Sequence, residues 1–107
     1  MKFKRNCTAA LKFLTQLEHL SQLLIACEDG LMDGTEQQTR LRARRDACAM
    51  LLSALPPREE RLVRLKYVCC LPPRLIMEKT GYSRSGYYDA LARAIEDVQE
   101  ELEGKIG

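Results

Sequence analysis

The sequence lacks the residue patterns of a metal or disulfide site. It has one histidine, His19, and five cysteines, none of which form a Cys-x-x-Cys pair. An odd number of cysteines without that spacing and without nearby histidines fits neither a zinc site nor a disulfide framework. We therefore predict no metal ion, no other cofactor and a reduced protein whose cysteines are small core residues.

Long apolar runs and one-sided charge are also missing. No stretch approaches the ~20 apolar residues of a spanning helix, and no apolar leader follows Met1. The 17 Lys and Arg residues nearly balance the 15 Asp and Glu residues, so the chain resembles neither a histone tail nor an acidic solubilising segment. With 107 residues and 46% hydrophobic content, we expect one soluble intracellular domain with no membrane partner.

Catalytic patterns are absent as well. His19 follows Glu18 on an amphipathic segment without a nucleophile at a fixed spacing, and no glycine-rich phosphate loop occurs. The acidic pairs lie at predicted helix ends, where the helix dipole explains them. We predict that the chain is not an enzyme, has no catalytic residue and takes no small-molecule substrate.

The pattern that is present is helical, and no segment of useful length has strand periodicity. In the first half, apolar residues fall at alternating steps of four and three, in the a/d pattern of Phe13, Leu17, Leu20, Leu24, Cys27 and Leu31. Thr8 is the predicted N-cap, and Gly30 and Gly34 end this helix. Thr35 then caps a second helix, so residues 1–55 are predicted to form an antiparallel hairpin.

The second predicted helix ends at Pro56 and Pro57, because proline cannot donate the backbone hydrogen bond that a continuing helix needs. Its apolar side is predicted at Leu41, Ala47, Cys48, Leu51, Leu52 and Leu55. Its first half carries an arginine cluster, Arg40, Arg42, Arg44 and Arg45. This cluster is either a solvated face or a surface for phosphates or an acidic partner.

Residues 56–107 are predicted to form three more helices. The first follows the proline pair and carries Glu59 and Glu60 in its first turn, where negative charge is favourable. A helix of about two turns opens at Pro72 and Pro73 and ends near Gly81. The last runs from about Ser83 into the acidic tail, with Tyr87, Leu91, Ala94, Ile95, Val98 and Leu102 at helical spacing. The predicted fold is all-α, with about five helices.

The last two helices have the spacing of a helix-turn-helix, joined by "TGYS" at residues 80–83. Gly81 can adopt the left-handed conformation of the corner, Tyr82 can pack back as a staple, and the Ser83 hydroxyl can cap the next helix. If Tyr87 and Leu91 point inward, one outward face carries the polar side chains Arg84, Ser85, Tyr88 and Asp89. Such residues read base edges in the major groove, and the local charge of +4 from Arg58 to Arg93 favours a polyanion.

These residues resemble a known family. The run "PPREERLVRLKYVCCLPPRLIMEKTGYSRSGYYDALARAIEDV", residues 56–98, is similar to region 4 of bacterial sigma factors. The matching positions are Glu59, Glu60, Arg61, Leu65, Tyr67, Ile76, Gly81, Ser83, Arg84, Ser85, Tyr88 and residues 90–95. With the preceding hairpin, the whole chain resembles small phage transcriptional activators of the RinA and ArpU type, found in phages and prophages of Gram-positive bacteria.

The resemblance implies sequence-specific binding of double-stranded DNA and control of transcription in the cytoplasm of a bacterial host. It places Arg84, Ser85, Tyr88 and Asp89 at base-contacting positions, and it makes candidate phosphate contacts of Arg64, Lys66, Arg74 and Arg93. The sequence departs from the family pattern at Arg74, Leu75, Met77 and Gly86. Gly86 costs ~1 kcal/mol of helix propensity against alanine, so either the backbone approaches DNA closely there or the first turn is weak.

Other interpretations remain open at this stage. Residues 56–102 could be a plain three-helix core with a solvated arginine surface. A helical module that binds a protein such as RNA polymerase, with little DNA contact, is the functional alternative, and an activator needs both activities. The apolar pattern from Phe13 to Leu31 predicts either a homodimer or packing against the second helix.

Overall fold

Five α-helices and one 3₁₀ helix make up the described part of the chain. The computed structural model describes residues 2–28 and 35–106, and no strand occurs within these ranges. The helices are α1 (Thr8–Glu28), α2 (Thr35–Ala49), α3 (Pro57–Tyr67), α4 (Pro73–Thr80) and α5 (Arg84–Ile106), with the 3₁₀ helix η1 (Met50–Ala54) after α2. The prediction of an all-α fold with about five helices is confirmed.

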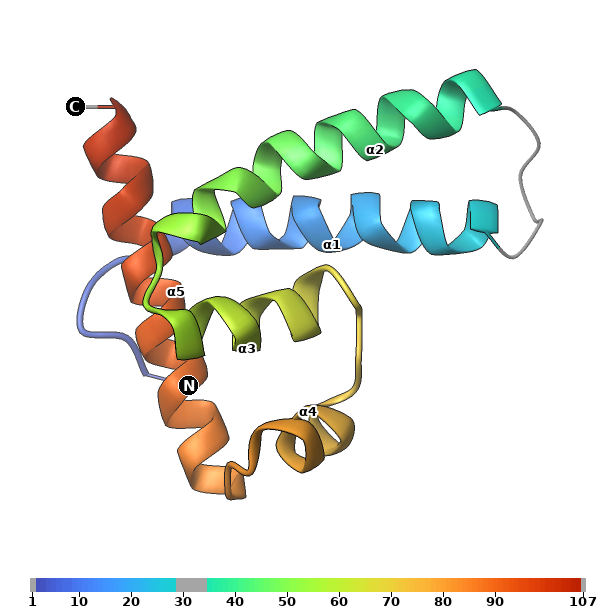
Figure 1. Cartoon of the computed structure of the whole chain (residues 1–107). Coiled ribbons are helices and arrows are strands. Elements are labelled where there is room, and N and C mark those ends of the chain that lie inside the picture. Colours follow the sequence, from blue (N-terminus) through green and yellow to red (C-terminus); the bar gives the residue numbers. More distant parts are fainter. Residues whose placement is uncertain (1, 29–34, 107) are drawn as a thin grey trace.

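Helices α1 and α2 lie side by side as a hairpin, and α3 packs on the other side of α1 (Figure 1). Helix α5 contacts α1, α3 and η1, whereas α4 packs on α3 near the first turns of α5. One hydrophobic cluster joins both halves of the chain, because Leu14 and Leu17 of α1 belong to the same cluster as Leu62 of α3 and Ile95 of α5. The regions 1–55 and 56–107 therefore share a core.

The start of α1 differs from the prediction. Thr8 is the first helical residue, and its backbone N–H donates to Oδ1 of Asn6 at 2.9 Å. The Cys7 carbonyl accepts the first helical hydrogen bond, from the N–H of Leu11 at 2.9 Å. The capping side chain is thus Asn6, two residues before the predicted one. A short amide side chain satisfies an exposed amide at a helix start as well as a hydroxyl does.

The apolar face of α1 is turned inward within the same chain. Its buried side chains are Ala10, Leu14, Leu17, Leu20, Ser21 and Leu24. Phe13 and Cys27 of the predicted pattern are only half-buried, and Leu31, Gly30 and Gly34 lie outside the described residues, as does the side chain of Thr35. Of the two explanations predicted for this pattern, the structure shows packing within one chain, against α2, α3 and α5. The homodimer stays a prediction.

The second helix is shorter than predicted. Its α-helical part stops at Ala49 and continues as η1, after which Leu55 adopts an extended conformation that leads into Pro56. Leu51, Leu52 and Leu55 are buried as predicted, whereas Leu41 and Cys48 are half-buried and Ala47 is exposed. The tighter winding of a 3₁₀ helix shifts the side chains around the axis, so it turns this leucine group onto α3 and α5.

The connection between α3 and α4 includes the one non-glycine residue with positive φ among the described residues, Cys70, at 57°. Before it, the Arg64 carbonyl accepts hydrogen bonds from the amides of Val68 and Cys69, and the Leu65 carbonyl accepts one from Leu71. These bonds satisfy two carbonyls of the last turn of α3 while the chain reverses into α4. Both helices begin with a proline at the first or second position, as predicted.

Candidate nucleic-acid interface

The corner between α4 and α5 has the geometry that the sequence predicts. Gly81 ends α4 in the left-handed region at φ 78°, and its N–H donates to the Met77 carbonyl at 2.8 Å. The Ser83 hydroxyl accepts a hydrogen bond from the N–H of Gly86 at 3.2 Å, and the Ser83 carbonyl accepts one from Tyr87 at 2.8 Å. Three residues, 81–83, separate the two helices, and both ends are capped.

The first turns of α5 divide cleanly into an inner and an outer face. Tyr87 is fully buried and Leu91 is 2% exposed. The four predicted base-contacting residues are all exposed and share the outer face, namely Arg84, Ser85, Tyr88 and Asp89. The buried side chains hold the helix on the core, so the backbone positions of the outer four residues are fixed relative to the core.

Two adjacent tyrosines on this helix have different environments. Their rings meet edge to face, with centroids 4.9 Å apart. Tyr88 is 40% exposed, whereas burial raises the pKa of Tyr87, with a smaller contribution from Tyr88. The Tyr87 hydroxyl is buried without a hydrogen-bond partner among the described residues. Tyr87 is therefore a packing residue that supports Tyr88 at the surface.

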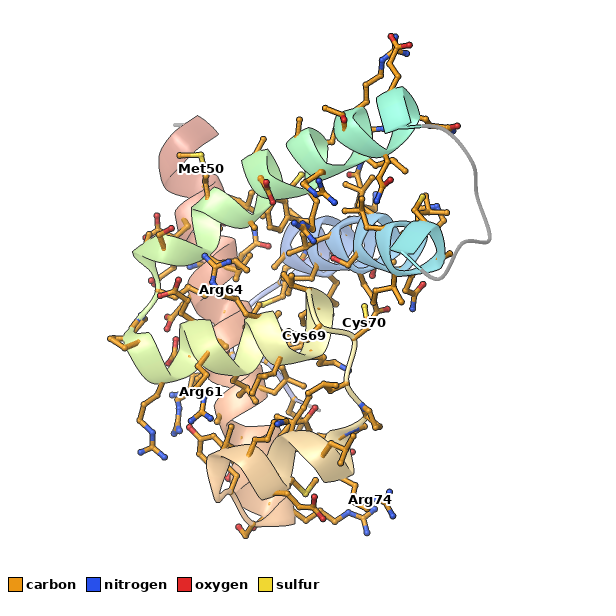
Figure 2. All side chains as sticks on the ribbon, turned by 45° about the vertical axis from the view of Figure 1, so that its right-hand side comes forward. Met50, Arg61, Arg64, Cys69, Cys70 and Arg74 are labelled. Atoms are coloured by element: carbon orange, nitrogen blue, oxygen red, sulfur yellow. The ribbon has the colours of Figure 1, made fainter. Side chains whose placement is uncertain are left out.

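The predicted phosphate-contacting residues do not form one group. Arg74 on α4 and Arg93 on α5 are exposed. Arg64 lies on the side of α3 that faces η1, away from Arg74, as Figure 2 shows. Its Nε donates to Glu60 at 2.9 Å and its Nη2 to the Ala49 carbonyl at 3.4 Å. The structure thus places Arg64 apart from the α4–α5 corner. Its hydrogen bond to the Ala49 carbonyl joins α3 to the end of α2.

Lys66 is also partly withdrawn from solvent. It is half-buried, and its ammonium group lies 5.3 Å from the centroid of the Tyr67 ring. A cation over an aromatic face is stabilised there, so the Lys66 ammonium group is less available to contact a phosphate. Burial raises the pKa of Tyr67 to about 12, so this ring stays neutral and keeps its hydroxyl proton.

Two arginines for which the sequence predicts no contact lie at the corner instead. Nη2 of Arg61 donates to the Lys79 carbonyl at 3.1 Å, in the last turn of α4. The Arg58 guanidinium lies 5.1 Å from the centroid of the Tyr82 ring. Both line a small hollow with Thr80 and Tyr82, and Figure 2 shows Arg61 on the α4 side of α3. Their spacing of three residues puts them on one helix face, but only the packing of α4 shows which face that is.

The structure gives a local reason for Gly86. A Cβ built at this position would lie 3.1 Å from Oγ of Ser83 and 3.6 Å from the Tyr82 ring. Ser83 could move away only by weakening its hydrogen bond to the Gly86 amide. Glycine therefore lets the cap and the Tyr82 staple fit over the first turn of α5.

Other kinds of site find little support in the described residues. Residues 2–28 and 35–106 contain no group of three or more metal-ligating side chains. No helix in these ranges is long and apolar enough to cross a membrane. Cys7, Cys48, Cys69 and Cys70 are free thiols, and His19 is exposed on α1. The exclusion of catalysis remains a prediction.

Comparison with known proteins assigns the chain to no family. The chain matches no protein-family model, no curated protein and no solved structure. The resemblance to sigma region 4 therefore depends on the residues quoted above, and the function depends on the geometry of the corner.

Proposed function

We propose that the protein is a transcriptional regulator that binds double-stranded DNA sequence-specifically, with the first turns of α5 in the major groove. One observation carries the proposal: behind a left-handed glycine corner, α5 exposes four polar side chains while its apolar side chains are buried. This arrangement matches how helix-turn-helix proteins present their second helix to base edges. The resemblance to regulators encoded by phages and prophages suggests the same role.

Each exposed residue has a chemistry suited to a base edge or a phosphate. The Arg84 guanidinium can donate two hydrogen bonds to O6 and N7 of guanine, and the Asp89 carboxylate can accept one from cytosine N4. Ser85 and Tyr88 can reach base edges or phosphates through their hydroxyl groups. Arg74 is exposed in the first turn of α4, at the opposite end of this helix from the corner, and is suited to position the duplex through a phosphate.

Selection of bound fragments from a random duplex pool tests the proposal directly. We expect enrichment of a common sequence, and affinity for it that falls steeply with salt because phosphate contacts release counterions. Replacement of Arg84 by alanine should cost ~1–3 kcal/mol of binding free energy at the selected site if the contact is bidentate. The control is Arg44→Ala, which removes an exposed arginine from α2 and should leave the affinity for the selected site unchanged.

Two results would count against the proposal. A pool that yields no common sequence at low salt would remove specific DNA binding. Equal losses for Arg84→Ala and Arg44→Ala would show that charge alone, and not the outer face of α5, determines affinity.

A protein-binding role has one observation in its favour. On α1, Leu11 is 39% exposed and Ile25 is 38% exposed, which leaves apolar surface on the hairpin. RNA polymerase is the partner that the resemblance suggests. A complex with polymerase that is insensitive to salt and is lost in Leu11→Glu, with DNA affinity unchanged, would assign this surface to a protein. An unchanged complex in Leu11→Glu would exclude it.

A further inference from the structure

The segment before α1 is held against α5, although the two are far apart in the sequence. Residues 2–7 precede the first helix and lie beside α5 (Figure 1). The sequence pattern gives this segment no role beyond a basic start. In the structure it lies along the helix whose first turns carry the proposed base-contacting residues.

Four residues hold the segment in place. The Phe3 side chain packs against the hydrophobic core, and the Cys7 side chain is 3% exposed within it. The Lys4 backbone N–H donates to the Glu96 carboxylate, and the Arg5 guanidinium pairs with Glu100 and Glu103. The acidic tail of α5 thus serves as the attachment for this arm.

The side chains next to Phe3 remain free to act at the surface. Lys2 and Lys4 are exposed. They line one surface hollow together with residues of α5, the full set being Lys2, Lys4, Asp89, Ala92, Arg93 and Glu96. The hollow begins at Asp89, the last of the outer residues of α5, and extends away from the corner to Glu96, about two helical turns further along α5.

We propose that residues 2–7 form an anchored arm whose Lys2 and Lys4 contact the phosphodiester backbone of the duplex, beside Arg93. The inference deepens the proposed function and rests on it. The partner is the sugar-phosphate chain at the edge of the groove that α5 reads. The contact adds affinity without reading sequence.

The geometry and the charges of the hollow fit this partner. Arg93 follows Asp89 by four residues, so it lies about 6 Å further along the helix axis on the same face. When the first turns of a helix are inserted in the major groove, the next turn meets the groove edge, where the phosphates are. Three cationic side chains line the hollow against two carboxylates. One carboxylate, that of Glu96, is already bonded to the Lys4 amide.

The experiment measures the affinity of the full chain for a short mixed-sequence duplex across a range of salt concentrations. The variant Lys2→Ala/Lys4→Ala removes both lysines and leaves Phe3 and Arg5 in place. The matched control, Arg42→Ala/Arg44→Ala, removes the same charge from exposed positions of α2. A third variant, Lys2→Arg/Lys4→Arg, keeps the charge in the arm.

We expect the slope of log affinity against log salt to become shallower by about 1.8 in Lys2→Ala/Lys4→Ala, about 0.9 for each lost phosphate contact. The control and the arginine variant should keep the slope of the unmodified chain. The relative affinities for different sequences should not change, because the arm reads no bases.

The outcomes separate the arm from the function it serves. Suppose that the unmodified chain binds the duplex, but that Lys2→Ala/Lys4→Ala has the same salt slope as the unmodified chain or a slope no shallower than that of the control. The arm is then refuted, while DNA binding stands. If the unmodified chain binds no duplex at low salt, the proposed function fails and the arm fails with it.

Discussion

Helices α2 and α5 both carry many charged residues on their surface, yet the core holds them differently. Among the described side chains of α2, only Ala49 at its end is buried. Helix α5 has a continuous buried stripe, made of Tyr87, Ala90, Leu91, Ala94, Ile95, Val98 and Gln99. The exposed residues of α5 are therefore fixed from behind, whereas the arginines of α2 lie on a helix held mainly by α1. Both helices have a charged surface. Only α5 also has buried side chains behind that surface, and such support holds surface residues in the defined positions that binding a specific partner requires.

The largest expected effect comes from truncating an inward-facing side chain on each of the two helices. Tyr87→Ala should lower the free energy of unfolding by ~3–5 kcal/mol, because it leaves a cavity where a large ring was fully buried. Leu41→Ala on α2 removes a half-buried side chain and should cost clearly less. Urea denaturation followed by circular dichroism measures both. Equal losses would mean that α2 is packed as firmly as α5.

The next effect concerns the start of α5. Ser83→Ala removes the hydroxyl that accepts the Gly86 amide, and it should cost about 0.5–2 kcal/mol of stability. Ser83→Asn keeps a capping oxygen and serves as the matched control. Thermal unfolding of the two variants checks the prediction. A loss of the same size in Ser83→Asn would argue that the hydrogen bond is not what matters at this position.

A smaller effect sharpens the role of the buried tyrosine. Its hydroxyl has no partner among the described residues, and an unsatisfied buried polar group is unfavourable. Tyr87→Phe keeps the ring and removes that group, so it should raise the free energy of unfolding by about 1 kcal/mol. The measurement is the urea midpoint at constant slope. If Tyr87→Phe instead lowers the free energy of unfolding, the Tyr87 hydroxyl has a hydrogen-bond partner in the folded protein.

The last test concerns a pH dependence of the contact between α3 and α5. Burial raises the pKa of Glu59 from 4.5 to about 7, the Asp97 carboxyl adds to this shift, and Arg93 opposes it. The native state therefore binds more protons than the unfolded chain between these values, and stability falls as pH rises through this window. Urea midpoints should decline from pH 4.5 to about 7 in the unmodified chain, and Glu59→Gln should flatten that decline. An equally steep decline in Glu59→Gln would assign it to other groups.

Local signals made the C-terminal half predictable. Proline pairs define the starts of α3 and α4, Gly81 has the left-handed conformation that the turn needs, and Ser83 caps α5. The inward direction of Tyr87 follows from helical spacing. Each of these features is determined by residues within a turn of one another, so the sequence pattern contains the information.

Features that depend on packing between distant segments were not predictable. The change from α2 to η1 at Met50 occurs within an apolar spacing that looks helical throughout. The direction of Arg64 depends on η1 packing against α3, and the position of Arg61 depends on α4. The arm is held by Glu96, Glu100 and Glu103, about ninety residues away, and no periodicity connects them.

The shared core of the hairpin and the α3–α5 bundle limits how the molecule can be divided. Leu14 and Leu17 cover part of the apolar surface to which Leu62 and Ile95 belong. A fragment that begins at Pro56 would leave that surface facing water. Cutting the chain before α3 would yield a fragment with an exposed apolar surface, which is prone to aggregate.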